Sequence, residues 1–189
     1  MKFKVSKGLN IPIGGNANPE IKNSVSVRNV ALLGEDYHGL KPTMLVKEGN
    51  VVIKGQDLFE DKKNPGLKFT SPVSGKIAEI NRGERRSFLS MVIEKNLNST
   101  SEVSFKSFRD ASELSRDSVI KNLIESGTWT SFKTRPFSKI PKIDTIPEEI
   151  FISLIGSDPL SLNPEIYLND KSEDFNFGLE VISYIPKNC

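Results

Sequence analysis

The amino-acid sequence predicts a mixed α+β fold, in which a small β half-barrel is joined to an incomplete α/β layer. Short apolar runs separated by glycines fill residues 40–95, as in the strands of a small barrel or sandwich. Apolar residues at helical spacing follow near residue 120. A later apolar run, residues 150–155, has the form of a buried strand. One strand and one helix cannot cover both faces of a sheet, so we expect these residues to be part of a longer polypeptide that completes the layer.

Alternating apolar and polar residues predict two short strands near the start of the chain. Phe3 and Val5 alternate with polar neighbours, and Val25, Val27 and Val30 continue the same period of two. Glycines interrupt both stretches, as expected for turns between strands. We therefore expect the chain to begin with strand-like segments rather than helices.

Residues 40–95 predict the strands of the half-barrel. Turn glycines recur at Gly49, Gly55, Gly66, Gly75 and Gly83. The apolar runs between them are too short for ordinary helices and rich in β-branched or aromatic residues: Val51–Ile53, Leu58–Phe59, Leu67 with Phe69, Ile77 with Ile80, and Phe88–Ile93. The segment Asn64-Pro65-Gly66 predicts a tight turn, because proline fixes φ and glycine accepts a positive φ.

Beyond residue 103 the period of the apolar residues changes from two toward that of a helix. The predicted elements are a strand over Val103–Phe108, a helix over 116–126 that Gly127 caps, a loop over 134–141, the buried strand over 150–155, and a last helix over 175–185 that Pro186 stops.

Composition and charge exclude several classes of function. Lys and Arg total 26 and Asp and Glu total 24, which gives a net charge of +2. A net charge this close to zero excludes nucleic-acid binding driven by the overall charge of the chain. The apolar runs are far shorter than the roughly 18–20 residues of a membrane-spanning helix, and there is no signal-peptide core, so we expect a cytoplasmic location. The only cysteine, Cys189, is the last residue, which excludes an internal disulfide and a multi-cysteine metal site. No glycine-rich phosphate loop is present.

Two polar clusters could bind a ligand or a partner. The only histidine, His38, follows two carboxylates, and an imidazole can transfer protons near neutral pH. An exposed loop histidine is the simpler explanation. The turn that contains Arg82, Arg85 and Arg86 could hold phosphate or carboxylate groups through guanidinium forks. The alternative is a solvent-exposed turn whose charged side chains keep the strands soluble.

A basic–aromatic stretch and a lysine pair are two further candidates. Residues 129–139 combine Trp129, Phe132, Arg135 and Phe137, the residue types that anchor interfaces or stack on an aromatic ligand. Packing as a loop over the core is the alternative. Lys62 and Lys63 precede the predicted tight turn, which is where a swinging-arm carrier presents its modified lysine, and a solvated charged turn is again the alternative.

The half-barrel zone resembles the biotinyl/lipoyl-like pattern. Residues 46–60 and 69–80 are similar to its turn of the EGD-V-xx-GQ type and to its SP-x-x-G-x-I strand. Lys62 lies near the position of the modified lysine in lipoyl domains. The hairpin is longer than a lipoyl hairpin, and the Met-Lys-Met surroundings of biotin carriers are absent.

From residue 1 to about Ile185 the chain resembles the N-terminal portion of one family, the NqrA subunits of the bacterial Na⁺-translocating NADH:quinone reductase. The segments that make the resemblance specific are Phe59–Gly66, Asn81–Arg86 and Thr134–Lys139, with further similarity in 7–15, 30–42, 125–130 and 158–165.

The resemblance implies a soluble subunit of a complex that oxidises NADH, reduces ubiquinone and exports sodium ions. It implies a peripheral position on the cytoplasmic side of the bacterial inner membrane, against the quinone-handling membrane subunit NqrB, and flavins and iron–sulfur centres in partner subunits. We expect a biotinyl/lipoyl-like half-barrel over residues 28–102, inserted in an incomplete Rossmann-like α/β domain formed by residues 1–27 and 103–189.

We expect a docking subunit that lines the quinone site and carries no catalytic residue, cofactor or metal of its own. The residues predicted to face quinone or a partner lie in the loops 34–42 and 132–139, with a basic turn beside them: Tyr37, His38, Lys41, Phe132, Arg135 and Phe137, and Arg82, Arg85 and Arg86. The alternatives are a lipoyl- or biotin-type carrier modified at Lys62 or Lys63, and a half-barrel used only as a binding module.

Overall fold

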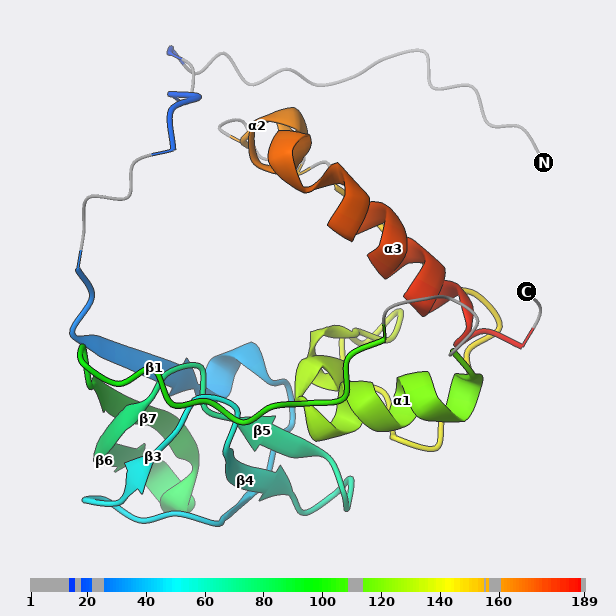
Figure 1. The fold of residues 1–189 in the computed structure, drawn as a ribbon. Coiled ribbons are helices and arrows are strands. Elements are labelled where there is room, and N and C mark those ends of the chain that lie inside the picture. The colour runs from blue at the N-terminus through cyan, green and yellow to red at the C-terminus, as the bar shows by residue number, and fades with distance from the viewer. Residues whose placement is uncertain are drawn as a thin grey trace.

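The computed structural model describes residues 14–15, 18–21, 26–108, 114–154, 156 and 161–187. Two antiparallel sheets face each other in the first part of the chain (Figure 1). The first sheet has the order β1 (Asn29–Leu33), β7 (Phe88–Lys95), β6 (Gly75–Arg82), β3 (Val51–Val52). The second has the order β2 (Pro42–Met44), β4 (Asp57–Asp61), β5 (Lys68–Thr70). The strands β2–β7 all come from the zone whose glycine spacing predicts a half-barrel.

Apolar residues from both sheets fill the space between them. In the first sheet Leu32 pairs with Met91, and Ile77 pairs with Ile93, so alternate positions point inward. The rings of Phe59 and Phe69 stack at 4.7 Å between centroids in the second sheet. The buried core consists of Leu32, Val46, Val52, Leu58, Phe59, Leu67, Phe69, Ile77, Met91, Ile93 and, from far along the chain, Trp129.

The turn glycines behave in two ways. Gly49, Gly55 and Gly66 have φ of +86°, +85° and +90°, as the turn prediction requires. Gly75 instead begins β6, where an added Cβ would collide with the backbone carbonyl of Glu94. The prediction of a turn at Gly75 is therefore wrong: this glycine lets two strands approach closely. Gly83 precedes the short 3-10 helix η2 (Glu84–Arg86) with an extended backbone.

In the described part of the chain three α-helices follow the barrel, and the two predicted ones are among them. Helix α1 (Arg116–Glu125) begins at a capping box formed by Ser115 and Ser118 and ends before Gly127, whose φ is +76°. The C-terminal end of α3 (Ser172–Ser183) and Ile185, which follows the helix, pack against α1 through Val181 and Val119. Figure 1 shows α1 between the barrel and α3. The short helix α2 (Pro164–Leu168), with Asn163 as its N-cap, was not predicted.

Two predicted strands are absent from the described residues. Residues 103–108 form no strand. The side chains of Val103 and Phe105 pack over Gly55, and the backbone pairing near them is limited to a single bridge between Lys54 and Glu102. Residues 150–154 have no regular secondary structure: Ile150 is half-buried against the cluster of Val119 and Ile185, and 151–154 are exposed, with Phe151 at 88% exposure. No described strand pairs with this run, and a strand forms only where a neighbour satisfies its backbone groups. Phe3, Val5 and Val25 lie outside the described residues, while Val27 is exposed and precedes β1.

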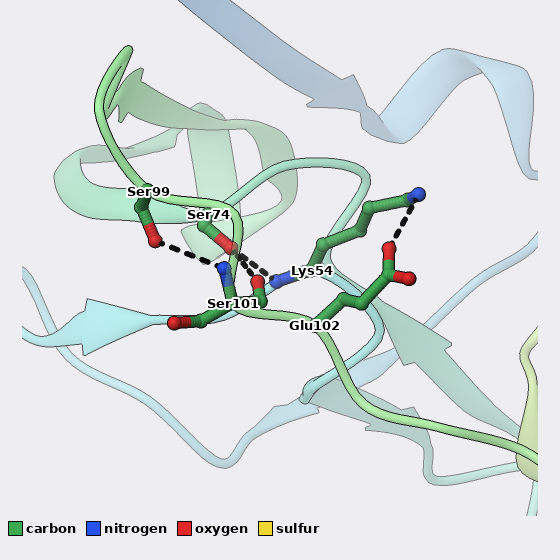
Figure 2. A network of polar contacts seen from close by, with 5 residues as sticks. All are labelled: Lys54, Ser74, Ser99, Ser101 and Glu102. Carbon is green, nitrogen blue, oxygen red and sulfur yellow. Dashed lines mark hydrogen bonds and ion pairs between the residues drawn. The ribbon is translucent and has the colours of Figure 1, made fainter.

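A polar network holds the segment after β7 against the barrel (Figure 2). The Ser74 hydroxyl accepts the backbone N–H of Lys54 at 2.8 Å and donates to the carbonyl of Ser101. The Lys54 ammonium pairs with Glu102 at 2.9 Å, although both side chains are more than half exposed. This segment therefore crosses the barrel as a strap and carries the chain toward α1. No helix among the described residues has the length and apolarity to cross a bilayer.

Candidate functional site

The two loops predicted to face a partner contact each other. The ammonium group of Lys133 donates to the carbonyl of Asp36 at 3.2 Å and lies 5.6 Å from the centre of the Tyr37 ring. These residues are about a hundred positions apart in sequence, and the 3-10 helix η1 (Gly34–Asp36) places the acceptor at the surface. The loops 34–42 and 132–139 thus form one surface, which we call the loop junction.

Tyr37 anchors the loop junction to the barrel core. Its half-buried ring meets Phe69 edge to face at 4.8 Å. Burial raises the pKa of the Tyr37 hydroxyl above its ordinary value of 10.0, and the adjacent Asp36 carboxylate raises it further. The phenol is therefore neutral at physiological pH and available as a hydrogen-bond donor. His38 and Lys41 are exposed beside it.

The loop 132–139 is closed by its own backbone. The N–H of Thr134 donates to the carbonyl of Lys139 at 2.8 Å, and the N–H of Ser138 donates to the carbonyl of Thr134 at 2.8 Å. The Arg135–Pro136 peptide bond is cis. This closure leaves Arg135 exposed and Phe137 71% exposed. Phe132 is different, because its half-buried ring packs against Trp129 at 5.3 Å and so belongs to the interior.

The basic turn lies next to the loop junction. An added Cβ on Gly34 would collide with the carbonyl of Phe88, so the start of β7 abuts η1. Arg85 and Arg86 have positive φ of 53° and 61°, and the guanidinium of Arg82 donates to the carbonyl of Arg86 at 3.3 Å. The three exposed guanidinium groups are therefore presented on a turn with a defined backbone close to residues 34–36.

The hairpin between β4 and β5 is tied down on both sides. The ammonium of Lys63 donates to the carbonyl of Gly39 at 2.6 Å. The buried side chain of Asn64 donates to the carbonyl of Pro141 at 3.1 Å and accepts the N–H of Ile143 at 3.3 Å. A swinging-arm lysine needs a hairpin tip free of other contacts, and of the two candidates only Lys62 keeps an exposed side chain without a hydrogen bond among the described residues.

Sequence reasoning missed the contribution of Asn64 and Lys142. Asn64 was part of a predicted turn, and nothing in its sequence context indicates a bridge to a segment beyond residue 140. Together with Tyr37, His38 and Lys139 these residues border a hollow of about 180 Å³. Among the described residues no group of three or more His, Cys, Asp or Glu side chains could hold a metal ion.

Two domains of one known protein family match this chain. Residues 3–96 match the NqrA N-terminal barrel-sandwich hybrid domain, and residues 114–188 match the NqrA second alpha/beta domain. The chain belongs to the NqrA family. The predicted fold class, a mixed α+β fold that combines a half-barrel with an α/β domain, is thereby confirmed, as is the resemblance to the N-terminal portion of NqrA. In the family match the α/β domain follows the half-barrel.

Curated NqrA proteins align with nearly the whole chain. Three of them, all NqrA subunits of a Na(+)-translocating NADH-quinone reductase, illustrate the match. The protein from Marinomonas sp. (strain MWYL1) is 46% identical over 185 residues, 98% of this chain and 42% of that protein. Those from Neisseria meningitidis serogroup A and Actinobacillus pleuropneumoniae serotype 5b are 48% and 47% identical, over 98% and 95% of this chain and 41% and 40% of their own lengths. The chain thus spans about two fifths of the NqrA proteins it matches.

Proposed function

We propose that this chain is the docking part of a Na⁺-translocating NADH:quinone reductase. In this role it sits at the periphery of the membrane on the cytoplasmic side, contacts the quinone-handling membrane subunit NqrB through the loop junction, and lines the quinone site. NADH oxidation, the flavins and the iron–sulfur centres belong to other subunits. The observation that carries the proposal is the contact of Lys133 with Asp36 and Tyr37. This contact joins the two loops that the sequence predicts, each on its own residues, to face quinone or a partner.

The exposed side chains of the loop junction suit a partner interface. Aromatic and arginine side chains contribute most to binding when they are held in place before the partner arrives. Arg135 and Phe137 meet this condition, because the hydrogen bonds of Thr134 and Ser138 close the loop that carries them. Little conformational entropy is then lost when the loop is covered.

The chemistry available at the loop junction is binding and positioning. The neutral Tyr37 phenol and the ammonium of Lys133 can donate hydrogen bonds to the oxygens of a quinone ring. We assign no catalytic residue, and electron transfer to quinone is the task of the redox groups in the other subunits.

The test uses the full-length protein expressed with the rest of the complex. In the variant R135A/F137A we expect weaker assembly or slower quinone reduction, while the isolated protein keeps its circular dichroism and unfolding midpoint. The matched control is R28A/F151A, which also removes one exposed arginine and one exposed phenylalanine, but outside the loop junction. Normal assembly and turnover of R135A/F137A, or an equal loss in the control, would reject the proposed surface.

A further inference from the structure

A small basic hollow lies at the seam where three segments of the chain meet. Its volume is about 180 Å³, and its walls come from residues 37–40, from the β4–β5 hairpin and from residues 139–142. The charged or titratable residues that line it, besides Tyr37, are His38, Asp61, Lys63, Lys139 and Lys142. Three lysines, one aspartate and one histidine thus line the hollow, and the ammonium group of Lys139 lies 6.0 Å from the centre of the Phe137 ring. We call this hollow the seam pocket.

The single carboxylate of the seam pocket is already engaged. Oδ1 of Asp61 accepts the backbone N–H of Lys41 at 3.2 Å and that of Lys63 at 3.1 Å, which stabilises the hairpin. Among the described residues, none of the ion pairs involves Lys63, Lys139 or Lys142. The pocket therefore keeps an excess of positive charge that an anion can neutralise.

The walls of the seam pocket are held by contacts that do not depend on a ligand. Lys63 is fixed on the carbonyl of Gly39, and Asn64 joins the hairpin to Pro141 and Ile143. The backbone of Lys139 is fixed by two hydrogen bonds from Thr134. The ammonium group of Lys63 and the backbone of Lys139 are therefore in place before an anion binds, which reduces the loss of conformational freedom on binding.

We propose that the seam pocket binds a phosphate group, either free phosphate or the phosphate of a membrane lipid. Ammonium groups bind phosphate oxygens through short, charge-assisted hydrogen bonds. A volume of about 180 Å³ accepts a phosphate-sized group with some of its water, and it is smaller than the roughly 300–1,000 Å³ of pockets that enclose drug-sized ligands. This proposal does not rest on the docking function, because free phosphate can be tested on the 189-residue chain without any partner.

The first experiment titrates the ¹⁵N-labelled chain with inorganic phosphate, with chloride adjusted to hold the ionic strength constant. We expect saturable changes of amide shifts at Gly39, Lys63 and Asn64. The variant K139Q/K142Q should bind phosphate about tenfold more weakly, because two charge-assisted contacts are removed. The control K76Q/K95Q makes the same change of net charge on β6 and β7 and should bind as the wild type does.

A second experiment separates the two sources of phosphate by sedimenting the same proteins with vesicles of phosphatidylglycerol and phosphatidylcholine. Vesicle binding that K139Q/K142Q loses and K76Q/K95Q keeps identifies a lipid phosphate. Phosphate binding in the first experiment without such vesicle binding identifies free phosphate. The proposal is overturned if the wild type shows saturable binding in neither experiment, or if both variants lose binding equally.

Discussion

The side chain of Asn64 and the carbonyl of Pro141 form a hydrogen bond of 3.1 Å across 77 residues of sequence. The same carbonyl accepts the indole N–H of Trp129 at 3.1 Å. A turn of the barrel, a buried ring and a proline-rich loop are therefore joined at one oxygen atom. This junction sets the position of residues 139–143, and hence one wall of the seam pocket.

Replacing Asn64 by alanine should lower the free energy of unfolding by about 1–3 kcal/mol, because it leaves the N–H of Ile143 without its acceptor in a half-buried position. Urea denaturation followed by circular dichroism measures the change. Asn98→Ala, at an exposed position, is the control and should stay within about 0.5 kcal/mol of the wild type. Equal stability of the two variants would mean that the bridge to residues 141–143 does not hold the junction.

Trp129 should behave as a core residue of the barrel, although it follows α1 in sequence. Its side chain is 2% exposed and packs with the barrel residues. Trp129→Ala should cost about 3–5 kcal/mol of stability through lost contacts and a cavity. Thermal unfolding measured by circular dichroism tests this, with Phe151→Ala as an exposed aromatic control. A loss as small as that of the control would contradict the packing of Trp129 in the barrel.

Two glycines should respond in opposite directions to alanine. Gly127 has a φ of +76°, and an added Cβ would lie 2.5 Å from the hydroxyl oxygen of Thr70, so Gly127→Ala should destabilise the protein by about 1–3 kcal/mol. Gly178 lies inside α3 with no atom within 4 Å of an added Cβ, so Gly178→Ala should stabilise the protein by about 0.5–1 kcal/mol. Denaturant midpoints of the two variants give both signs, and a shift in the same direction would refute the comparison.

Tyr37 should make the stability of the protein sensitive to alkaline pH. Its folded-state pKa is raised by burial and by Asp36, so the unfolded chain loses this proton first. The contribution of the phenol is present below its ordinary pKa of 10.0 and is lost as pH rises through the folded-state pKa. Between about pH 9 and about pH 11 the wild type should lose more stability than Tyr37→Phe. Parallel stability curves for the two proteins would show that burial does not perturb this hydroxyl.

Local patterns were sufficient for most of the regular elements. The glycine spacing and short apolar runs predict β3–β7, since alternation and positive-φ turns depend on neighbouring residues. The helix ended by Gly127 follows from its apolar spacing and its cap in the same way. The strand predicted at 150–155 failed within its described residues, because strand formation depends on a partner that no local pattern supplies.

By itself the sequence determined the barrel strands β3–β7, the helices α1 and α3, the family and the two loops that form the candidate surface. Only the tertiary structure decided that these loops touch, that Phe132 turns inward while Phe137 stays exposed, and that Asn64 brings Lys139 and Lys142 beside Lys63. The physical reason is that turns and helices are stabilised by contacts within a few residues. The loop junction and the seam pocket depend instead on hydrogen bonds between segments far apart in sequence, such as those of Asn64 with Pro141 and Lys133 with Asp36.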